Sequence, residues 1–276
     1  MIPFSGSVGK GKSDASLSSI MKQSAQKAIK AIGKFASNTR TPYIINLSFN
    51  VPQNNVIILA KKQELTRSGM KNNYVSVWGL DGASKTTSIQ HVASVFEKNG
   101  YPTTITRKPG GTPLAEEVRN LHKRTWDERV TPFSELMLMM TTFNQLSENV
   151  IVPSLNKGNS VIEDRGWGCT FAYQIFERQP ELESTFFSLI AGAYQHVLPE
   201  KILFLDVEPE EGLRRSSRRG ALDRLEQQHI DFFYRARRGY QELARRFPDQ
   251  IHTVDANEDV ESVQKSVTAW ANSVIK

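Results

Sequence analysis

The chain has 276 residues, and 39% of them are hydrophobic, which is enough to build one large or two small domains with a buried core. No apolar run approaches the roughly 20 residues that a transmembrane helix needs, and the single cysteine, Cys169, excludes an internal disulfide framework. These features predict a soluble globular protein of a reducing, cytoplasmic compartment, which would be the host cytoplasm if the chain is viral.

The formal net charge of +6 is concentrated near the N-terminus. Residues 1–73 contain many lysines and arginines but only two acidic residues, Asp14 and Glu64, whereas the rest of the chain has more acidic than basic residues. A domain that binds a polyanion would carry its basic excess on its own surface. The charge pattern therefore separates a basic extension, residues 1–73, from a domain, residues 74–276, that requires no nucleic acid as a partner.

The extension contains segments of different character. Residues 1–14 are rich in Gly, Ser and Lys and are predicted to be disordered. Within residues 17–35, apolar residues recur at helical spacing with lysines between them. This predicts a basic amphipathic helix that packs on the domain, stays weakly ordered, or contacts an anionic surface or a partner. Residues 43–49 and 55–60 are strand-like and predict a small hairpin. The acid-poor start leaves organelle targeting as an alternative.

A glycine-containing loop follows the first strand-like run of the domain, residues 74–78, and precedes a helix-like stretch, residues 88–98. Its sequence resembles the phosphate-binding pattern G-x-x-x-x-G-K-[ST], in which backbone N–H groups and the following helix N-terminus point at the phosphates of a nucleotide. The residues of this loop that we predict to bind ATP are Gly79, Leu80, Asp81, Gly82, Ala83, Ser84, Lys85, Thr86 and Thr87.

Three residues of the loop carry specific expectations. Lys85 is expected to bind the β- and γ-phosphates as a catalytic residue, and the Thr86 hydroxyl is expected to bind Mg²⁺. Ser84 stands where the pattern has its second glycine, so it would cost about 1–3 kcal/mol if the loop needs a positive φ there. The simpler alternative is a Gly- and Ser-rich turn before a helix, in which Lys85 is only solvated.

Strand-like and helix-like segments alternate along the whole domain. This order predicts an α/β fold of three layers, of the P-loop NTP-hydrolase type, with a five-stranded parallel sheet flanked by helices. The loop would then lie at the carboxyl edge of a strand, where such sheets bind ligands. The predicted strands are residues 74–78, 103–106, 160–163, 201–207 and 251–254, and the predicted helices are residues 88–98, 113–124, 133–151, 181–196, 209–219, 226–246 and 259–274.

Further motifs, in this order and at this spacing, resemble the bacterial-type thymidylate kinases. They are the segments 106–112, 135–151, 163–165, 205–209 and 223–226, with the phenylalanine pair at 232–233. The resemblance covers residues 74–276. It implies transfer of the γ-phosphoryl group of ATP to dTMP, giving dTDP for dTTP synthesis, with Mg²⁺ bound and with the protein acting as a homodimer. Such a transfer needs charge neutralisation and in-line positioning, because the acceptor phosphate is already an anionic nucleophile.

The resemblance also assigns charged residues to the phosphates. Arg165 would grip the acceptor phosphate and the migrating phosphoryl group as a catalytic residue, since a guanidinium fork binds phosphate oxygens in pairs. Asp164 would lie beside Mg²⁺ or its water shell. Arg107 and Arg119 are candidates for contacts with the acceptor phosphate, and the alternative for both is a solvated surface charge.

The basic run 214–219 resembles the mobile lid of these kinases. In members whose P-loop lacks an arginine, as this loop does at Leu80 and Ala83, the lid supplies the cation that contacts the transition state. Arg215 and Arg219 match basic positions of the lid and are therefore predicted to be catalytic. The alternative for such a charge run is a solvated helix face.

Three residues resemble the family positions around the sugar and phosphate of the acceptor. Asp81 matches an acidic residue that faces the sugar 3′-hydroxyl and the phosphate site. Tyr173 matches an aromatic residue that leaves no room for a 2′-hydroxyl, although it could equally be a packed helix tyrosine. Thr170 belongs to the same matched stretch and is assigned to the substrate site with it.

The departures from the family gather where the base should bind. Family members place a phenylalanine and, four residues later, an arginine where this chain has Met139 and Phe143. A phenylalanine cannot donate a hydrogen bond to a thymine carbonyl, although it could stack on the base. In addition, Lys108 replaces a glutamate, Trp78 replaces a glutamate, and Gly166 replaces a tyrosine or histidine.

These observations leave three hypotheses. The first is an active thymidylate kinase with a divergent base pocket, in which Met139 and Phe143 still contact the substrate. The second is a kinase for another or a modified deoxypyrimidine monophosphate. The third is a non-catalytic nucleotide-binding module, which Ser84 and the long extension favour. Retention of Lys85, Thr86, Arg165, Arg215 and Arg219 disfavours it.

Overall fold

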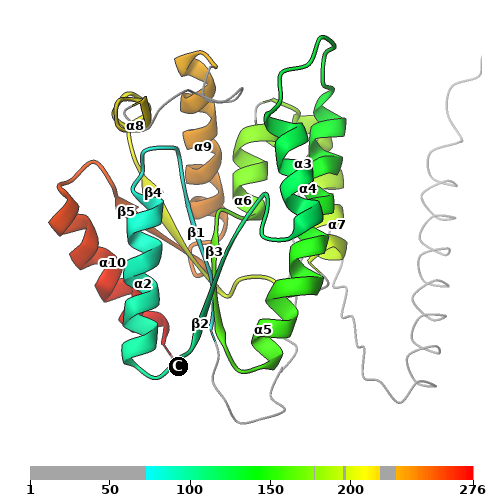
Figure 1. The fold of residues 1–276 in the computed structure, drawn as a ribbon. Coiled ribbons are helices and arrows are strands. Elements are labelled where there is room, and N and C mark those ends of the chain that lie inside the picture. The colour runs from blue at the N-terminus through cyan, green and yellow to red at the C-terminus, as the bar shows by residue number, and fades with distance from the viewer. Residues whose placement is uncertain (1–72, 177, 195–196, 218–227, 276) are drawn as a thin grey trace, which may run out of the picture. The chain divides into compact units, whose positions relative to one another are not determined.

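The computed structural model describes residues 73–276 apart from 177, 195–196, 218–227 and 276 (Figure 1). The predicted amphipathic helix and hairpin of the extension lie outside the described residues. So does Arg219 of the predicted lid. Among the described residues, no helix is both long enough and apolar enough to cross a membrane.

A parallel sheet of five strands forms the centre of the described domain, as the sequence predicts. The strand order is β2-β3-β1-β4-β5, so β1 is the middle strand and both β3 and β4 pair with it. All six residues of β1 are buried, as expected for a strand that is covered on both faces. The strands are β1 (Tyr74–Gly79), β2 (Thr103–Arg107), β3 (Ser160–Asp164), β4 (Lys201–Asp206) and β5 (Ile251–Asp255).

Helices cover both faces of this sheet and give the three predicted layers (Figure 1). The helices α2 (Lys85–Lys98) and α10 (Val260–Val274) pack together on one face. The opposite face carries α3 (Pro113–Lys123), α4 (Pro132–Leu146), α7 (Glu183–Ala193) and α9 (Ile230–Arg246). Shorter helical segments are α5 (Val152–Asn156), α6 (Trp167–Thr170) and α8 (Pro209–Ser216), with a 3₁₀ turn at Pro180–Leu182 and π-helical turns at Ser147–Ile151 and Phe171–Ile175.

Local sequence signals explain where several helices begin. The Thr112 hydroxyl accepts a hydrogen bond from the Ala115 amide, and Pro113 takes the first position of α3. Thr131 and Pro132 start α4 in the same way, and the Asp259 carboxylate caps α10. A hydroxyl or carboxylate cap satisfies amide groups that have no partner within the helix, and proline loses nothing at the first helical position.

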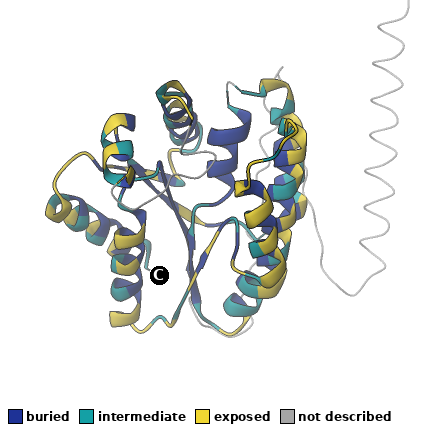
Figure 2. Cartoon of the chain, turned by 45° about the horizontal axis from the view of Figure 1, so that its top comes forward, coloured by how far each residue is buried: buried dark blue, intermediate teal, exposed yellow. Residues whose placement is uncertain are grey.

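The hydrophobic core is continuous from the sheet into the helices on both faces (Figure 2). The indole of Trp78 on β1 lies edge-on to Trp167, with ring centroids 4.9 Å apart, and packs against Gly168. A Cβ atom at Gly168 would lie 2.3 Å from the Trp78 ring, so only glycine leaves room for this indole. Trp78 therefore acts as a core residue that joins β1 to α6.

Candidate nucleotide-binding site

The predicted phosphate-binding loop joins β1 to α2 at the edge of the sheet where the strands end. It leaves β1 at Gly79, where a Cβ atom would lie 2.6 Å from the Leu205 carbonyl oxygen of β4. Gly82 has a φ of 80°, and Ser84 has φ 62° and ψ 25°, which is the left-handed conformation. The expected strain at Ser84 is therefore present, because this serine adopts the backbone conformation for which the pattern normally uses glycine.

Lys85 is buried inside the loop that it follows. Its ammonium group donates hydrogen bonds to the carbonyl oxygens of Gly79, at 3.1 Å, and Leu80, at 2.7 Å. Burial and the nearby charge of Arg165 together lower its pKa to about 8, against the opposing charges of Asp81 and Asp164. The ammonium group of Lys85 is therefore held at the loop by two neutral carbonyl oxygens, which the negatively charged phosphates of a nucleotide would replace as partners.

Arg165 and Asp81 form an ion pair that joins the end of β3 to the phosphate-binding loop. The side chains are partly exposed, at 24% and 19% respectively, so the pair faces the loop edge rather than the core. Arg165 has a φ of 68°, and its amide donates to the Val77 carbonyl oxygen at 3.0 Å. The structure therefore brings together Asp81, Lys85 and Arg165, three residues that the sequence predicts for one site.

The two predicted magnesium ligands also lie at this edge. Thr86 is exposed in the first turn of α2, and Asp164 ends β3. One oxygen of Asp164, Oδ1, is buried and has no hydrogen-bond partner among the described residues. No group of three or more His, Cys, Asp or Glu side chains in this part of the chain could hold a metal alone. One hydroxyl and one carboxylate fit Mg²⁺, which keeps several waters and binds largely through the phosphates of its nucleotide.

Arg107 is the last residue of β2, and Arg119 lies within α3. Arg107 ends β2 next to Asp164 in the strand register, and its guanidinium donates to both oxygens of Glu116, at 3.0 and 2.9 Å. Arg119 donates to the carbonyl oxygen of Pro109 at 2.9 Å. Arg107 therefore lies beside the site, and Arg119 contacts the 107–111 loop that follows β2.

The residues predicted to surround the sugar and the base are packed in the interior. Met139, Phe143, Thr170 and Tyr173 are 3%, 1%, 3% and 6% exposed. The Phe143 ring lies 5.4 Å from the ring of Tyr194, and Tyr173 contacts Phe232 and Tyr240. Met139, Phe143 and Tyr173 therefore belong to the hydrophobic core, and Thr170 is buried as well.

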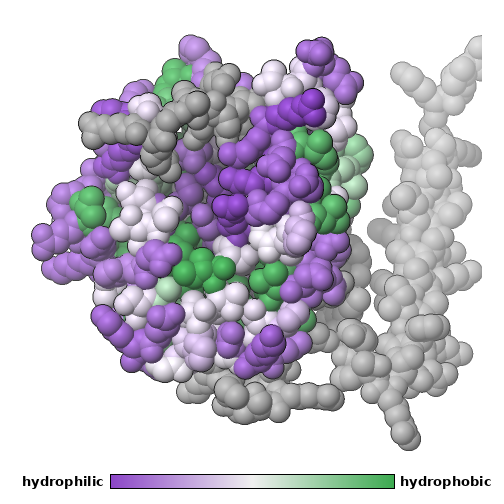
Figure 3. Space-filling model, in the orientation of Figure 1, coloured by the Kyte–Doolittle hydropathy of each residue, from purple (hydrophilic) through white to green (hydrophobic). Residues whose placement is uncertain are grey.

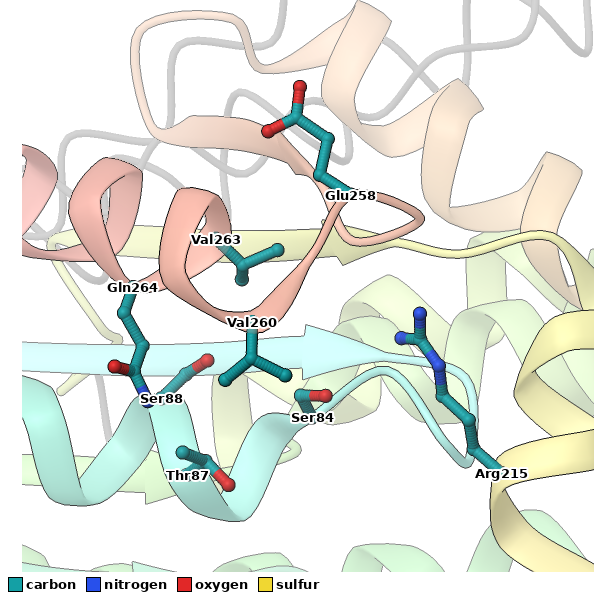
Figure 4. A pocket seen from close by; sticks show the side chains of 8 residues that line it. All are labelled: Ser84, Thr87, Ser88, Arg215, Glu258, Val260, Val263 and Gln264. Atoms are coloured by element: carbon teal, nitrogen blue, oxygen red, sulfur yellow. The ribbon is translucent and has the colours of Figure 1, made fainter.

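The described part of the predicted lid begins at the C-terminal end of α8. Arg215 donates to Glu211 Oε1 at 2.6 Å and to the Ala256 carbonyl oxygen at 2.8 Å. Its guanidinium borders a pocket at the start of α2 (Figure 4). The pocket is lined by Ser84, Thr87, Ser88, Arg215, Glu258, Val260, Val263 and Gln264.

Comparison with known proteins identifies this arrangement. The family model described as "Thymidylate kinase" matches residues 77–267. The chain belongs to the thymidylate kinase family. The "Thymidylate kinase" of Idiomarina loihiensis is 38% identical over 200 residues, which cover 72% of this chain and 96% of that relative. The "Thymidylate kinase" of Pseudoalteromonas translucida is 39% identical over 199 residues, covering 72% and 95%.

The fold agrees with a solved structure of the same name. The crystal structure of thymidylate kinase from Ehrlichia chaffeensis matches with a TM-score of 0.56 and 24% identity, covering 72% of this chain and 98% of that chain. Its likeness bears on the fold, and it supports the predicted P-loop α/β class.

Sequence reasoning missed the contact that holds α8 on the phosphate-binding loop of this thymidylate kinase family member. A Cβ atom at Gly82 would lie 2.1 Å from the Gly212 carbonyl oxygen, and one at Gly212 would lie 2.6 Å from the Asp81 carbonyl oxygen. Figure 1 shows α8 beside the β1–α2 loop. Gly212 lies within a predicted helix and belongs to no sequence motif, so only its close approach to the Asp81 backbone explains why the residue is glycine.

Proposed function

We propose that the chain transfers the γ-phosphoryl group of ATP to dTMP and so produces dTDP for dTTP synthesis. The observation that carries the proposal is the convergence of Asp81, Lys85, Asp164 and Arg165 where β1 and β3 end. Membership of the thymidylate kinase family supports the same reaction.

The chain's own residues supply positioning and charge. The loop amides from Gly82 to Thr86 and the N-terminus of α2 would hold the donor phosphates, with Lys85 on their β- and γ-oxygens. Arg165 would turn from Asp81 to the acceptor phosphate, where its guanidinium neutralises charge on the entering and migrating groups. Asp81 would then be released toward the sugar 3′-hydroxyl. In-line placement of two anions is the main catalytic requirement, and these contacts meet it without a covalent intermediate.

Magnesium fits the same edge. Thr86 and Asp164 would hold it, directly or through water, and when bound it would supply charge neutralisation on the β- and γ-phosphate oxygens. Asp164 Oδ1 accepts no hydrogen bond from any described residue, so this oxygen is available to bind the ion or one of its waters. Arg107 and Arg119 would complete the acceptor side, and Arg215 and Arg219 the donor side.

The residues at the expected base-binding positions favour an alternative acceptor nucleotide. Phe143 and Met139 stand where a thymine-reading helix face is expected, and neither side chain can donate a hydrogen bond to a base carbonyl. Loss of one such paired contact commonly costs about 1–3 kcal/mol. Another or a modified deoxypyrimidine monophosphate is therefore the alternative substrate for the same phosphate machinery.

A coupled ADP-release assay tests the proposal. ATP and Mg²⁺ are combined with dTMP, dUMP, modified dUMPs, dCMP, dGMP or UMP, and preference for dTMP is the expected result. Lys85→Ala should abolish turnover while the circular dichroism spectrum stays unchanged. Preference for another nucleotide would assign the second substrate, and silence across the panel would support a non-catalytic module.

We also propose a homodimer, which the family resemblance implies. Several large apolar side chains of β2, α3 and α4 are 41–49% exposed: Ile105, Leu114, Leu121, Phe133 and Met137. Figure 3 shows hydrophobic surface over α3 and α4. Light scattering should give a dimer mass for the purified chain and a monomer mass for the double variant Leu121→Glu with Phe133→Glu, since two buried charges would oppose association. A monomeric parent chain would refute the dimer.

A further inference from the structure

A fully buried ion pair, Lys108 with Glu163, lies close to the edge of the sheet where β2 and β3 end. The ammonium nitrogen of Lys108 is 2.6 Å from Glu163 Oε1, and the two side chains are 1% and 0% exposed. Lys108 directly follows Arg107, the last residue of β2, and Glu163 lies on β3, two residues before Arg165. The pair therefore links the two segments that carry the acceptor-side arginines.

Aromatic rings close the pair off from water. The Lys108 ammonium group lies 3.4 Å from the ring centroid of Tyr194 and 4.6 Å from that of Phe143. Cation–π attraction is stronger in such a desolvated place than at the surface. Burial lowers the pKa of Lys108 to about 8 against the opposing charge of Glu163, while burial raises the pKa of Glu163 against the opposing charge of Lys108. Each charge is therefore kept in the interior by its partner.

The other side of Glu163 supports the backbone of the phosphate-gripping residue. A Cβ atom at Gly166 would lie 2.7 Å from Glu163 Oε2, 2.9 Å from Ser76 Oγ and 3.1 Å from Trp78 Nε1. The Ser76 hydroxyl accepts from Trp78 Nε1 at 2.8 Å and donates to the carbonyl oxygen of Arg165. The backbone of Arg165 and Gly166 thus rests directly on this polar cluster.

Four departures from the family pattern meet at this one place. Lys108 forms the pair, Phe143 covers its ammonium group, and Trp78 and Gly166 lie against Glu163 or its neighbour Ser76. They occur at separate points of the sequence, but contact places them in one cluster. Substitutions that pack together in this way act as a unit, because each one changes the space and charge that the others must match.

We propose that Lys108 and Glu163 are positioning residues, whose ion pair sets the 107–111 loop and the Arg165 backbone for the acceptor nucleotide. The inference rests on the proposed kinase function. The Lys108 amide donates to the Asp164 carbonyl oxygen at 2.9 Å, so the loop is bound to β3 through both main chain and side chain. Misplacement of reacting groups by a fraction of an ångström lowers rate strongly, which gives an internal pair influence over turnover.

The physics of buried ion pairs provides a way to separate positioning from stability. Removing one partner leaves a charge buried and unpaired, whereas replacing both partners by apolar side chains of similar volume is often neutral for stability. The single variants Lys108→Met and Glu163→Gln are therefore compared with the double variant Lys108→Met with Glu163→Leu. Glu183→Gln is a control, because it weakens the Arg246–Glu183 pair, which has the same 2.6 Å separation and is only partly buried.

The experiment measures urea unfolding together with kcat and KM for dTMP and for ATP in the full chain. Lys108→Met should reduce stability and reduce kcat/KM for dTMP at least about tenfold, with KM for ATP within about twofold of the parent value. The double variant should recover stability while kcat/KM for dTMP stays about tenfold low. The control variant should leave the kinetics unchanged.

Two results would overturn the inference while leaving the proposed function intact. One is a double variant whose kinetics return to the parent values together with its stability, since the pair would then be structural only. The other is a folded Lys108→Met variant with parent kinetics. A parent chain that phosphorylates no nucleotide would overturn the proposed function, and this inference with it.

Discussion

Replacing Ser84 by glycine should stabilise the protein, although serine-to-glycine changes usually destabilise. Ser84 has φ 62° and ψ 25°, where an L-residue other than glycine pays about 1–2 kcal/mol. Glycine removes that cost but makes the unfolded chain more flexible, which offsets about 0.5–1 kcal/mol. The expected net gain in unfolding free energy is therefore about 0.5–1 kcal/mol.

The serine hydroxyl does not complicate this difference. Ser84 makes no side-chain hydrogen bond to the start of α2, and its carbonyl oxygen accepts from the Ser88 amide, a main-chain bond that glycine keeps. Ser84→Ala is the matched control, because alanine loses the hydroxyl but retains the Cβ atom and so retains the strain. Its stability should stay within about 0.5 kcal/mol of the parent chain.

Urea unfolding of the ligand-free proteins measures the prediction. A gain of this size moves the midpoint upward by about 0.2–0.5 M for an ordinary urea dependence, without a change in slope. The glycine variant should also bind ATP at least as well, because the loop keeps the conformation it already has. A glycine variant no more stable than the alanine variant would refute the strain reasoning.

Three further predictions concern the same edge of the sheet and the core beneath it. Gly212→Ala should raise KM for ATP about tenfold, because its Cβ atom would lie 2.6 Å from the Asp81 carbonyl oxygen, whereas Gly192→Ala, which meets nothing within 4 Å, should not. In a pH series, kcat/KM for ATP should fall above about pH 8, because Lys85 of the free enzyme loses its proton there. The value of kcat at saturating ATP should stay constant to higher pH, because bound phosphates favour the charged form of the amine. A flat kcat/KM profile to pH 10 would refute that assignment. Gly168→Ala should lower the unfolding free energy by about 1–3 kcal/mol through its clash with the Trp78 ring, a change that thermal melting would detect.

The sheet was predictable because strand-like and helix-like segments alternate along the chain, and because β1 is buried along its whole length. Helix ends were less predictable. The sequence predicts one helix over residues 133–151, whereas α4 ends at Leu146 and a π-helical turn continues it to Ile151. Residues 167–175 form further helical turns that were not predicted from the sequence. A single π-helical turn shifts the apolar pattern by only one residue, and a periodicity that is averaged over several turns does not resolve that shift.

The phosphate-binding loop could be predicted as a unit because its residues are consecutive. The positioning pair could not, since Lys108 and Glu163 are distant in sequence and meet only through the β2–β3 register, in which Thr106 stands opposite Glu163. A sequence signal did exist. Lys108 exchanges an expected acid for a base, and such a reversal next to a buried strand requires a compensating acid nearby.

Ser84 and Arg165 both have a strained backbone, but different contacts hold each of them in that conformation. Among the described residues, positive φ outside glycine occurs at Ser84, which is in the same loop as Asp81, and at Arg165, which forms the ion pair with Asp81. Strain persists where surrounding structure determines it, and Arg165 is bonded on both sides, its amide to Val77 and its carbonyl to Ser76. That conformation delivers the guanidinium to Asp81, so relaxing it would misplace the group that we propose binds the acceptor phosphate. The Ser84 side chain makes no hydrogen bond to the start of α2. Replacing Ser84 by glycine should therefore relieve strain without loss of a contact, whereas relieving the strain at Arg165 would move its guanidinium away from Asp81.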